Sequence, residues 1–251
     1  MHKLACLTFV ALSGVLTQCL AAETSVTVTT GAGYVPMVKQ IVQVCKNRYA
    51  APAAESYGGN VGQMLAQIAA GSGVNVVVTD KNTIERIKTP VRFSVRQTLG
   101  TTPLVLIWKK GVTLAKPEDV ASETVRTVAI PDPKAAVYGR AGSQWVRNQN
   151  NASLTAKLLQ VSGVPQVAGY VARGEVDAGF VNLQAARKGL KDFGGMFVID
   201  KGYDPIELQA LVVEGHETSP SVRKFLACLR SAEVGEALER AGVLAPAAGT
   251  P

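Results

Sequence analysis

The stretch Val167–Asn182, which reads VAGYVARGEVDAGFVN, combines the end of an amphipathic helix, a glycine stop and a short buried strand. Val167 and Val171 recur at helical spacing, and Gly174 stands where a left-handed helix C-cap is expected. The apolar run that ends at Asn182 predicts a strand that returns into a sheet. Because the carboxyl ends of strands in α/β sheets face the ligand crevice, this pattern directs Asn182 toward a ligand.

Strand and helix patterns alternate along the rest of the chain. The apolar spacing predicts strands over 25–30, 53–57, 74–79, 103–109, 125–130, 177–182, 197–199 and 208–213. It predicts helices over 35–49, 58–71, 82–87, 138–148, 154–161, 164–173 and 219–241. This alternation indicates parallel sheets covered by helices, so the predicted class is α/β. Trp108 falls in a predicted strand and Trp145 in a predicted helix, and we expect both in the core.

Composition indicates a globular protein of one large domain or two ordinary ones. The chain has 251 residues, of which 47% are apolar and 18% charged. The net charge of +7 suits an anionic ligand, but solvated surface charge is the favoured explanation. The basic residues are scattered and form no arginine-rich run, so we expect no nucleic-acid partner.

The first 22 residues have the pattern of a secretory signal peptide. Lys3 precedes the apolar run Leu4–Leu16, which is too short for a comfortable membrane span. We expect the mature chain to begin at Glu23 and the protein to be exported to the periplasm. The alternatives are a lipoprotein cut at Cys19 and a retained anchor helix.

Two cysteines remain after the signal peptide. Cys6 and Cys19 lie within it, which leaves Cys45 and Cys228. An even pair in an exported protein predicts one disulfide, with two buried thiols as the alternative. The one histidine of the mature chain, His216, has no cluster of ligating residues beside it, so we expect no metal site and no cofactor.

Four glycine-containing loops precede predicted helices. A helix N-terminus presents unpaired N–H groups and the positive end of the helix dipole, and several aimed at one cleft can hold an anion. Any one loop is explained by turn geometry alone, so the interpretation depends on the set: Gly31–Gly33, Gly58–Gly62, Asp132–Gly139 and Ser162–Val164.

These segments resemble the periplasmic solute-binding proteins of the molybdate-binding type across nearly the whole mature chain. The opening stretch is similar to that family's "ERGEADAGIVY" segment. The other similarities pair GAG at 31–33 with "AAS", QIAAG at 67–71 and VVVTD at 76–80 with "QIEAGAPADLFISAD", and AIPDP at 129–133 with "AVGDP".

The resemblance implies the type II periplasmic binding protein fold, with two Rossmann-like lobes, a ligand cleft and two crossover strands. Lobe I is expected at 23–103 plus 208–246 and lobe II at 104–207, with a frayed tail at 247–251. The chain then leaves lobe I near Pro103 and returns near Leu208. The two helices that carry the cysteines belong to the same lobe in that family.

The family holds its oxyanion with backbone amides and hydroxyl groups. The resemblance carries those positions onto Gly33, Val61 with Asn60 beside it, Tyr138, Val164 and Asn182. All three familiar hydroxyl donors are therefore replaced, which predicts a ligand other than molybdate in a roomier pocket. Asn60, Asn182 and the Tyr138 hydroxyl can donate instead. Lys134 and Arg140 can reach a carboxylate or phosphonate, or remain surface charges.

The sequence therefore predicts a monomeric, exported solute-binding protein that captures a small anionic ligand for the membrane permease of an ABC importer. The alternative is an exported accessory or sensor protein that acts through a protein partner. An enzyme is disfavoured because neither a Gly-x-Ser-x-Gly nor a His-Glu-x-x-His motif is present. We interpret Asp80, Asp132 and Asp177 as turn and cap residues.

Overall fold

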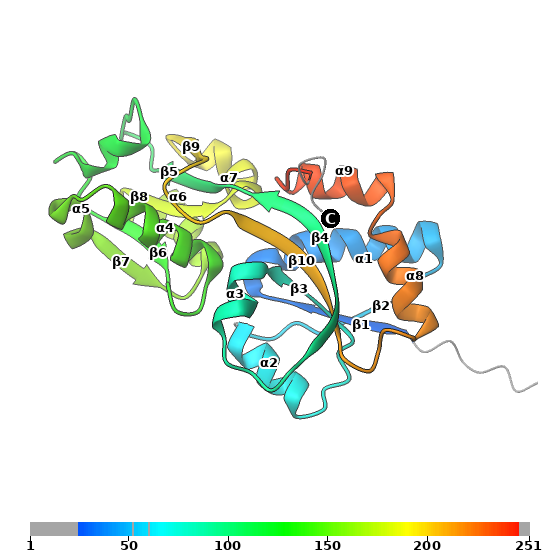
Figure 1. Ribbon diagram of the computed structural model, residues 1–251. Helices are drawn as coiled ribbons and strands as arrows, with labels where there is room; N and C mark the ends of the chain where they lie inside the picture. The colour runs from blue at the N-terminus through cyan, green and yellow to red at the C-terminus, as the bar shows by residue number, and fades with distance from the viewer. Residues whose placement is uncertain (1–24, 52, 60, 246–251) are drawn as a thin grey trace, which may run out of the picture.

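The computed structural model describes residues 25–51, 53–59 and 61–245. Within them the chain forms two five-stranded mixed sheets that stand side by side, each with helices packed on it (Figure 1). The predicted α/β class with two lobes is confirmed. We call the first sheet with its helices lobe I and the second sheet with its helices lobe II.

Lobe I contains both ends of the described chain. Its strand order is β2-β1-β3-β10-β4, in which β1 runs parallel to β2 and β3, while β10 runs antiparallel to β3 and β4. Its elements are β1 (Val26–Thr30), η1 (Ala32–Tyr34), α1 (Val35–Tyr49), β2 (Ala53–Glu55), α2 (Val61–Ala69), β3 (Val76–Asp80), α3 (Lys81–Arg86), β4 (Phe93–Thr102), β10 (Ile206–Val213), α8 (Pro220–Cys228) and α9 (Ala232–Arg240).

Lobe II is built from the middle of the chain. Its strand order is β7-β6-β8-β5-β9, in which β6 runs parallel to β7 and β8, while β5 runs antiparallel to β8 and β9. Its elements are β5 (Leu104–Trp108), η2 (Pro117–Ala121), β6 (Val128–Pro131), α4 (Val137–Asn148), α5 (Ala152–Ala156), β7 (Leu158–Val161), α6 (Val164–Ala172), β8 (Ala178–Asn182), α7 (Leu183–Gly189), η3 (Leu190–Asp192) and β9 (Gly195–Ile199).

Helices cover both faces of each sheet. In lobe I, Val76 and Val78 of β3 belong to the cluster that includes α1, whereas Val77 belongs to the cluster that includes α2 and α3. In lobe II, Gly179 of β8 lies against α6 and its neighbour Phe180 lies against α4. The central strands β3, β5 and β8 are therefore buried along their whole length, as is usual for α/β sheets.

The chain crosses between the lobes twice, and the crossings lie beside each other. β4 continues through Pro103 into β5, and residues 200–205 lead from β9 back to β10. The Tyr203 hydroxyl accepts a hydrogen bond from the Leu104 backbone N–H (2.9 Å) and donates one to the Ile199 carbonyl (2.6 Å). This hydroxyl ties the two crossing segments together.

A disulfide joins Cys45 of α1 to Cys228 of α8. Both helices pack on lobe I, and both cysteines are buried. The predicted disulfide is confirmed. Its partners are 183 residues apart in sequence, so the bridge closes a covalent ring that includes all of lobe II.

One sequence expectation is wrong in part, and one strand was missed. The helix expected over 154–161 ends at Ala156, and Leu158–Val161 is strand β7 instead. Leu158 pairs with Val128 of β6, so the choice between helix and strand is made by a partner distant in sequence. Strand β4 was not expected from the sequence, although it supplies one edge of the first sheet. Trp108 and Trp145 are buried, as predicted.

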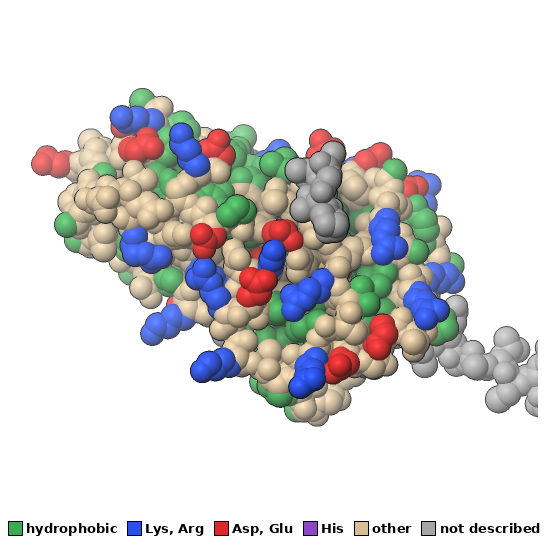
Figure 2. Space-filling view, in the orientation of Figure 1, with side chains coloured by type: hydrophobic (Ala, Val, Ile, Leu, Met, Phe, Trp, Pro, Cys, Tyr) green, Lys and Arg blue, Asp and Glu red, His purple; other side chains and the backbone are tan. Residues whose placement is uncertain are grey.

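The proposed signal peptide at 1–22, the alternative cut at Cys19 and the tail at 247–251 lie outside the described residues. In the part of the chain that the structure describes, no helix is long and apolar enough to cross a membrane. Acidic and basic side chains are interspersed over the face shown in Figure 2.

Candidate functional site

A cavity of about 560 Å³ lies between the two lobes. Lobe I contributes the loops that precede α1 and α2, and lobe II contributes the loops that precede α4 and α6. Its described lining is Gly31, Ala32, Gly33, Tyr34, Gly59, Val61, Gln63, Asp132, Ala135, Ala136, Val137, Tyr138, Ser162, Gly163, Val164, Pro165 and Gln166. The structure therefore brings all four glycine-containing loops to one place.

Helix starts dominate the wall of this cavity. Val61, Val137 and Val164 are the first residues of α2, α4 and α6, and the short helix η1 precedes α1. The first N–H groups of a helix have no partner within it, and the helix dipole makes that end positive. Four such ends around one cavity provide N–H donors and a positive field.

The structure places four of the predicted ligand-binding residues in the lining: Gly33, Val61, Tyr138 and Val164. Asn60 lies outside the described residues, but Gly59 and Val61 on either side of it line the cavity.

Asn182 does not line the cavity. Its side chain is buried at the end of β8 and is engaged on both sides. The amide Oδ1 accepts a hydrogen bond from the Ala185 N–H (2.7 Å) and caps α7, while Nδ2 donates to the Gly33 carbonyl of lobe I (2.9 Å). Asn182 thus joins the two lobes beside the cavity.

Gly33 leaves room where a side chain could stand. A Cβ placed on Gly33 would lie 4.0 Å from the nearest ring atoms of Tyr138, which is ordinary van der Waals distance. Gly139 is the opposite case, because a Cβ there would overlap the Pro131 carbonyl. The first turn of α4 can approach the end of β6 only because this position is glycine.

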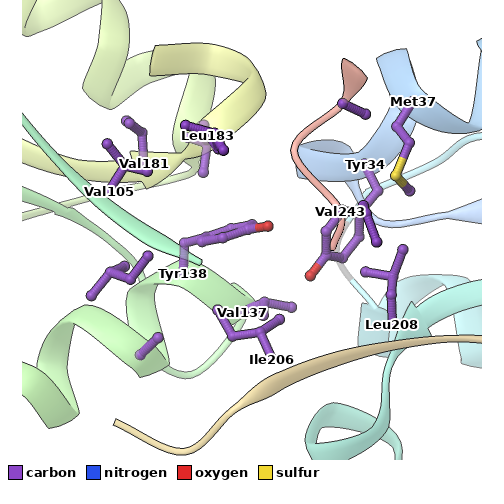
Figure 3. Close-up of a cluster of buried hydrophobic side chains, with 14 of the residues drawn as sticks. Tyr34, Met37, Val105, Val137, Tyr138, Val181, Leu183, Ile206, Leu208 and Val243 are labelled. Carbon is purple, nitrogen blue, oxygen red and sulfur yellow. The ribbon is translucent and has the colours of Figure 1, made fainter. Parts of the chain in front are cut away.

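Two tyrosines from different lobes meet next to the cavity. The rings of Tyr34 and Tyr138 are 5.9 Å apart in an edge-on arrangement, and both point into the seam between the lobes (Figure 3). The Tyr138 hydroxyl is 3.1 Å from the Thr102 hydroxyl. Burial raises the pKa of both tyrosines well above the usual range, so both hydroxyls stay neutral hydrogen-bonding groups.

The cavity has little formal charge. Among its described lining residues, Asp132 is the one charged side chain. The Asp132 Oδ1 accepts a hydrogen bond from the Lys134 N–H (2.8 Å), which is the turn role expected from sequence. Neither Lys134 nor Arg140 lines the cavity.

Arg140 instead reaches across the seam. Its guanidinium donates to the Thr83 hydroxyl and lies 3.8 Å from the Asp80 carboxylate, both on lobe I. Asp80 caps α3, as expected, by accepting the Thr83 N–H (2.9 Å). Burial raises the pKa of the Asp80 carboxyl, while Thr83 and Arg140 oppose that shift.

Sequence reasoning missed four lining residues: Tyr34, Gln63, Pro165 and Gln166. Each glutamine is the third residue of its helix, so the helix-start pattern could have indicated both. Gln166 is internally engaged, because its Oε1 accepts from the Ser162 N–H (2.9 Å) and its Nε2 donates to the Tyr170 hydroxyl (2.8 Å). Within the described ranges, no group of three or more His, Cys, Asp or Glu side chains could hold a metal ion.

Comparison with known sequences identifies a family for almost the whole chain. A family profile described as bacterial extracellular solute-binding protein matches residues 26–244. The molybdate-binding protein ModA of Azotobacter vinelandii is 25% identical over 241 residues, which cover 93% of this chain and 95% of that protein.

Solved structures share the fold. The periplasmic molybdate-binding protein of Azotobacter vinelandii matches with a TM-score of 0.75 at 23% identity, over 89% of this chain and 100% of that one. PEB3 with bound L-phospholactate, a protein of Campylobacter jejuni, matches at 0.69 and 15% identity, over 87% and 98%. The sulfate-binding protein SubI of Mycobacterium tuberculosis matches at 0.63 and 12% identity, over 88% and 87%.

Proposed function

Because this chain belongs to the family of bacterial extracellular solute-binding proteins, we propose that it captures a small organic anion between its two lobes and passes it to the membrane permease of an ABC importer. The observation that carries the proposal is the convergence of four helix starts on one interlobe cavity. Helix N-termini bind anions through backbone N–H groups and the helix dipole, without a full counter-charge.

The size and lining of the cavity favour an organic ligand. Its volume of about 560 Å³ falls within the range of pockets that hold small organic molecules. Ala136, Val137, Val164 and Pro165 give it apolar walls between the helix starts. An anionic head at the N–H groups and a carbon body against these walls would use both features. The same fold in PEB3 accommodates L-phospholactate, which is such a molecule.

The hydroxyl groups expected of a molybdate site are missing at Gly33, Val61 and Asn182. A hydrogen bond to a charged group contributes about 1.5–3 kcal/mol, so three losses would remove tight oxyanion binding. Two possible replacements are already engaged, because Tyr138 is bonded to Thr102 and Asn182 to Gly33 and Ala185. We therefore propose that the ligand is not molybdate.

Closure of the lobes is the proposed mechanism. The segments expected to move as units are 23–103 with 208–246, and 104–207. Tyr203 ties the two crossings together and marks the hinge between these units. A ligand that contacts both lobes stabilises the closed form more than the open one, and the permease can then distinguish the two.

The remaining parts of the proposal concern the protein's setting. Its family consists of extracellular solute-binding proteins rather than enzymes, which supports export and a non-enzymatic role. We propose that residues 1–22 are removed, that the mature protein is periplasmic and monomeric, and that its partners are its ligand and the permease.

The test is thermal unfolding of the mature chain from Glu23 against molybdate, tungstate, sulfate, phosphate, vanadate and a set of small carboxylates, phosphonates and phosphate esters. A ligand at one hundred times its Kd adds about 2.7 kcal/mol of stability, which corresponds to a rise of about 5–10 °C in Tm. We expect an organic anion to give this rise.

Two matched variants locate the binding. Gly163 has extended backbone and lines the cavity, so Gly163→Val fills the site without backbone strain. Gly235 lies on an exposed part of α9 with open space around its Cβ position, so Gly235→Val is the control. The rise should vanish in the first variant and persist in the second. Submicromolar molybdate binding would overturn the proposed specificity, and no rise with any anion would favour an accessory or sensor protein.

A further inference from the structure

A chain of polar contacts joins the lobes behind the ligand cavity. The Arg140 Nη2 of lobe II donates to the Thr83 Oγ1 of lobe I, and that hydroxyl in turn donates to the Asp80 Oδ2. The same Nη2 lies 3.8 Å from the Asp80 Oδ1. Both bonding partners of the Arg140 guanidinium therefore belong to the opposite lobe.

The seam around this contact is largely closed to solvent. The Asp80 side chain is 3% exposed and the Arg140 side chain 20%. Tyr34 of lobe I and Tyr138 of lobe II are buried close enough to Asp80 for its charge to help raise the pKa of both hydroxyls. An ion pair that is shielded in this way is weakly screened by salt.

Helix α4 connects this contact to the ligand cavity. Val137 and Tyr138, at the start of α4, line the cavity, and Arg140 follows within the same first turn. A second cavity of about 230 Å³ lies on the other side of Val137 and is lined by Asp80 and Arg140. A movement of α4 that opens the ligand cavity would therefore also carry Arg140 away from lobe I.

Opening would break this contact without unfolding either lobe. The bonds from the Thr83 N–H and hydroxyl to Asp80 lie within lobe I and can remain when Arg140 leaves. Arg140 is held by the helical backbone of α4. The contact can therefore form and break as a unit, which is the behaviour of a two-state element.

We propose that Arg140 is a positioning residue that latches the two lobes through Thr83 and Asp80, so that it sets how tightly the ligand is held without touching the ligand. This proposal deepens the proposed function and depends on lobe opening. The latch favours the closed form even in the absence of ligand, and it slows ligand release because opening must first break it.

The first test measures lobe separation without any ligand. Spin labels are attached to Ala66→Cys in α2 of lobe I and Gln160→Cys in β7 of lobe II, which are both exposed positions. Pulsed electron paramagnetic resonance then reports the distance between the two lobes. Arg140→Gln should shift the distribution to longer distances. Arg147→Gln, the same charge change two turns along α4 at a residue that bonds to Ser143 of its own helix, should not.

Two further variants separate a latch from general damage. Arg140→Lys keeps the charge and should restore most of the closed population. Asp80→Asn removes the charge but still caps α3, so it should open the lobes as Arg140→Gln does. The double variant should open them no further than either single change, because both remove the same interaction.

The second test measures the release rate of the anion that gives the largest rise in Tm. Arg140→Gln should speed release about tenfold. Unchanged distances and an unchanged release rate in Arg140→Gln would overturn the latch and leave the proposed function intact. If no anion binds, the distance measurement still decides the latch, and only the proposed function fails.

Discussion

The side-chain amide of Asn182 donates a hydrogen bond to the carbonyl oxygen of Gly33 over 2.9 Å. Asn182 ends a strand of lobe II and Gly33 belongs to the short helix η1 of lobe I, so this bond spans the seam beside the ligand cavity. The same side chain caps α7 through its other atom, which allows the two roles to be separated by substitution.

Asn182→Asp should keep the cap and lose the interlobe bond. A carboxylate also caps a helix well, but it cannot donate to the Gly33 carbonyl and would face it with like charge. The loss of one hydrogen bond, about 1 kcal/mol, should weaken ligand affinity about 5- to 10-fold. Calorimetric titration with the strongest anion measures this. Equal affinity in both proteins would contradict the interlobe role.

Gly33→Ser should gain affinity for tetrahedral oxyanions. A Cβ fits at Gly33 without overlap, and the new hydroxyl would stand in the cavity wall, at the position that the resemblance to molybdate-binding proteins pairs with a serine. One added hydrogen bond to a charged ligand is worth about 1.5 kcal/mol, or about tenfold in Kd. Molybdate titration of this variant beside Gly33→Ala isolates the hydroxyl. A gain that is equal in both variants would contradict the hydrogen-bond explanation.

Asp177 should make lobe II acid-sensitive. Its Oδ1 pairs with the Lys109 Nζ (2.6 Å), and its Oδ2 accepts from the backbone N–H groups of Arg126 (2.6 Å) and Thr127 (3.1 Å). Burial opposes ionisation of Asp177, but Lys109 and these two backbone groups outweigh it and lower the pKa of the carboxyl. Asp177→Asn should cost about 2–3 kcal/mol at neutral pH.

The pH dependence follows from the direction of that shift. A carboxyl with a lowered pKa in the folded state adds stability that is complete above its unfolded pKa, near 3.9, and is lost as pH falls through the folded value. Urea unfolding should therefore show a constant difference between wild type and Asp177→Asn from about pH 5 to 8, and a shrinking difference below about pH 4. A difference that grows in acid would contradict this account.

The Cys45–Cys228 disulfide should contribute much of the stability of lobe I. A bridge between residues 183 apart strongly restricts the unfolded chain, so its removal should cost about 2–5 kcal/mol. The Cys45→Ala, Cys228→Ala double variant should unfold at clearly lower urea concentration than the oxidised protein. Reduction of the wild type should reproduce most of the effect, and an unchanged midpoint in both would contradict it.

Local pattern was enough for elements that carry their own signals. Gly174 adopts the left-handed conformation that its place after α6 predicts, and the strand that ends at Asn182 is present. Strand β7 was mistaken for helix because a four-residue segment with three apolar residues fits both periods, and its pairing with β6 decides between them. Local sequence pattern predicts structure least well where pairing with a distant segment decides between helix and strand.

In the functional site, too, some features follow from local sequence and others depend on distant contacts. The four loops could be found from glycines and helix starts, since each signal lies within a few residues. The role of Asn182 and the contact of Arg140 with Thr83 could not, because each depends on how one lobe meets the other. The hydrogen bond between Arg140 and Thr83 joins residues 57 positions apart, and the one between Asn182 and Gly33 joins residues 149 positions apart. No local stretch of sequence contains both partners of either bond.

The place of β10 in its sheet sets an order of assembly. It is the last strand of the described residues, yet it lies inside the first sheet, between β3 and the edge strand β4. A chain synthesised from its N-terminus has every strand of the second sheet once Ile199 has been added, while the first sheet still lacks the strand between β3 and β4. Lobe II can therefore complete its sheet first, and lobe I completes its sheet only when β10 is added. Any protein shortened before Ile206 would lack the strand that pairs with both β3 and β4, so lobe I could not form its five-stranded sheet.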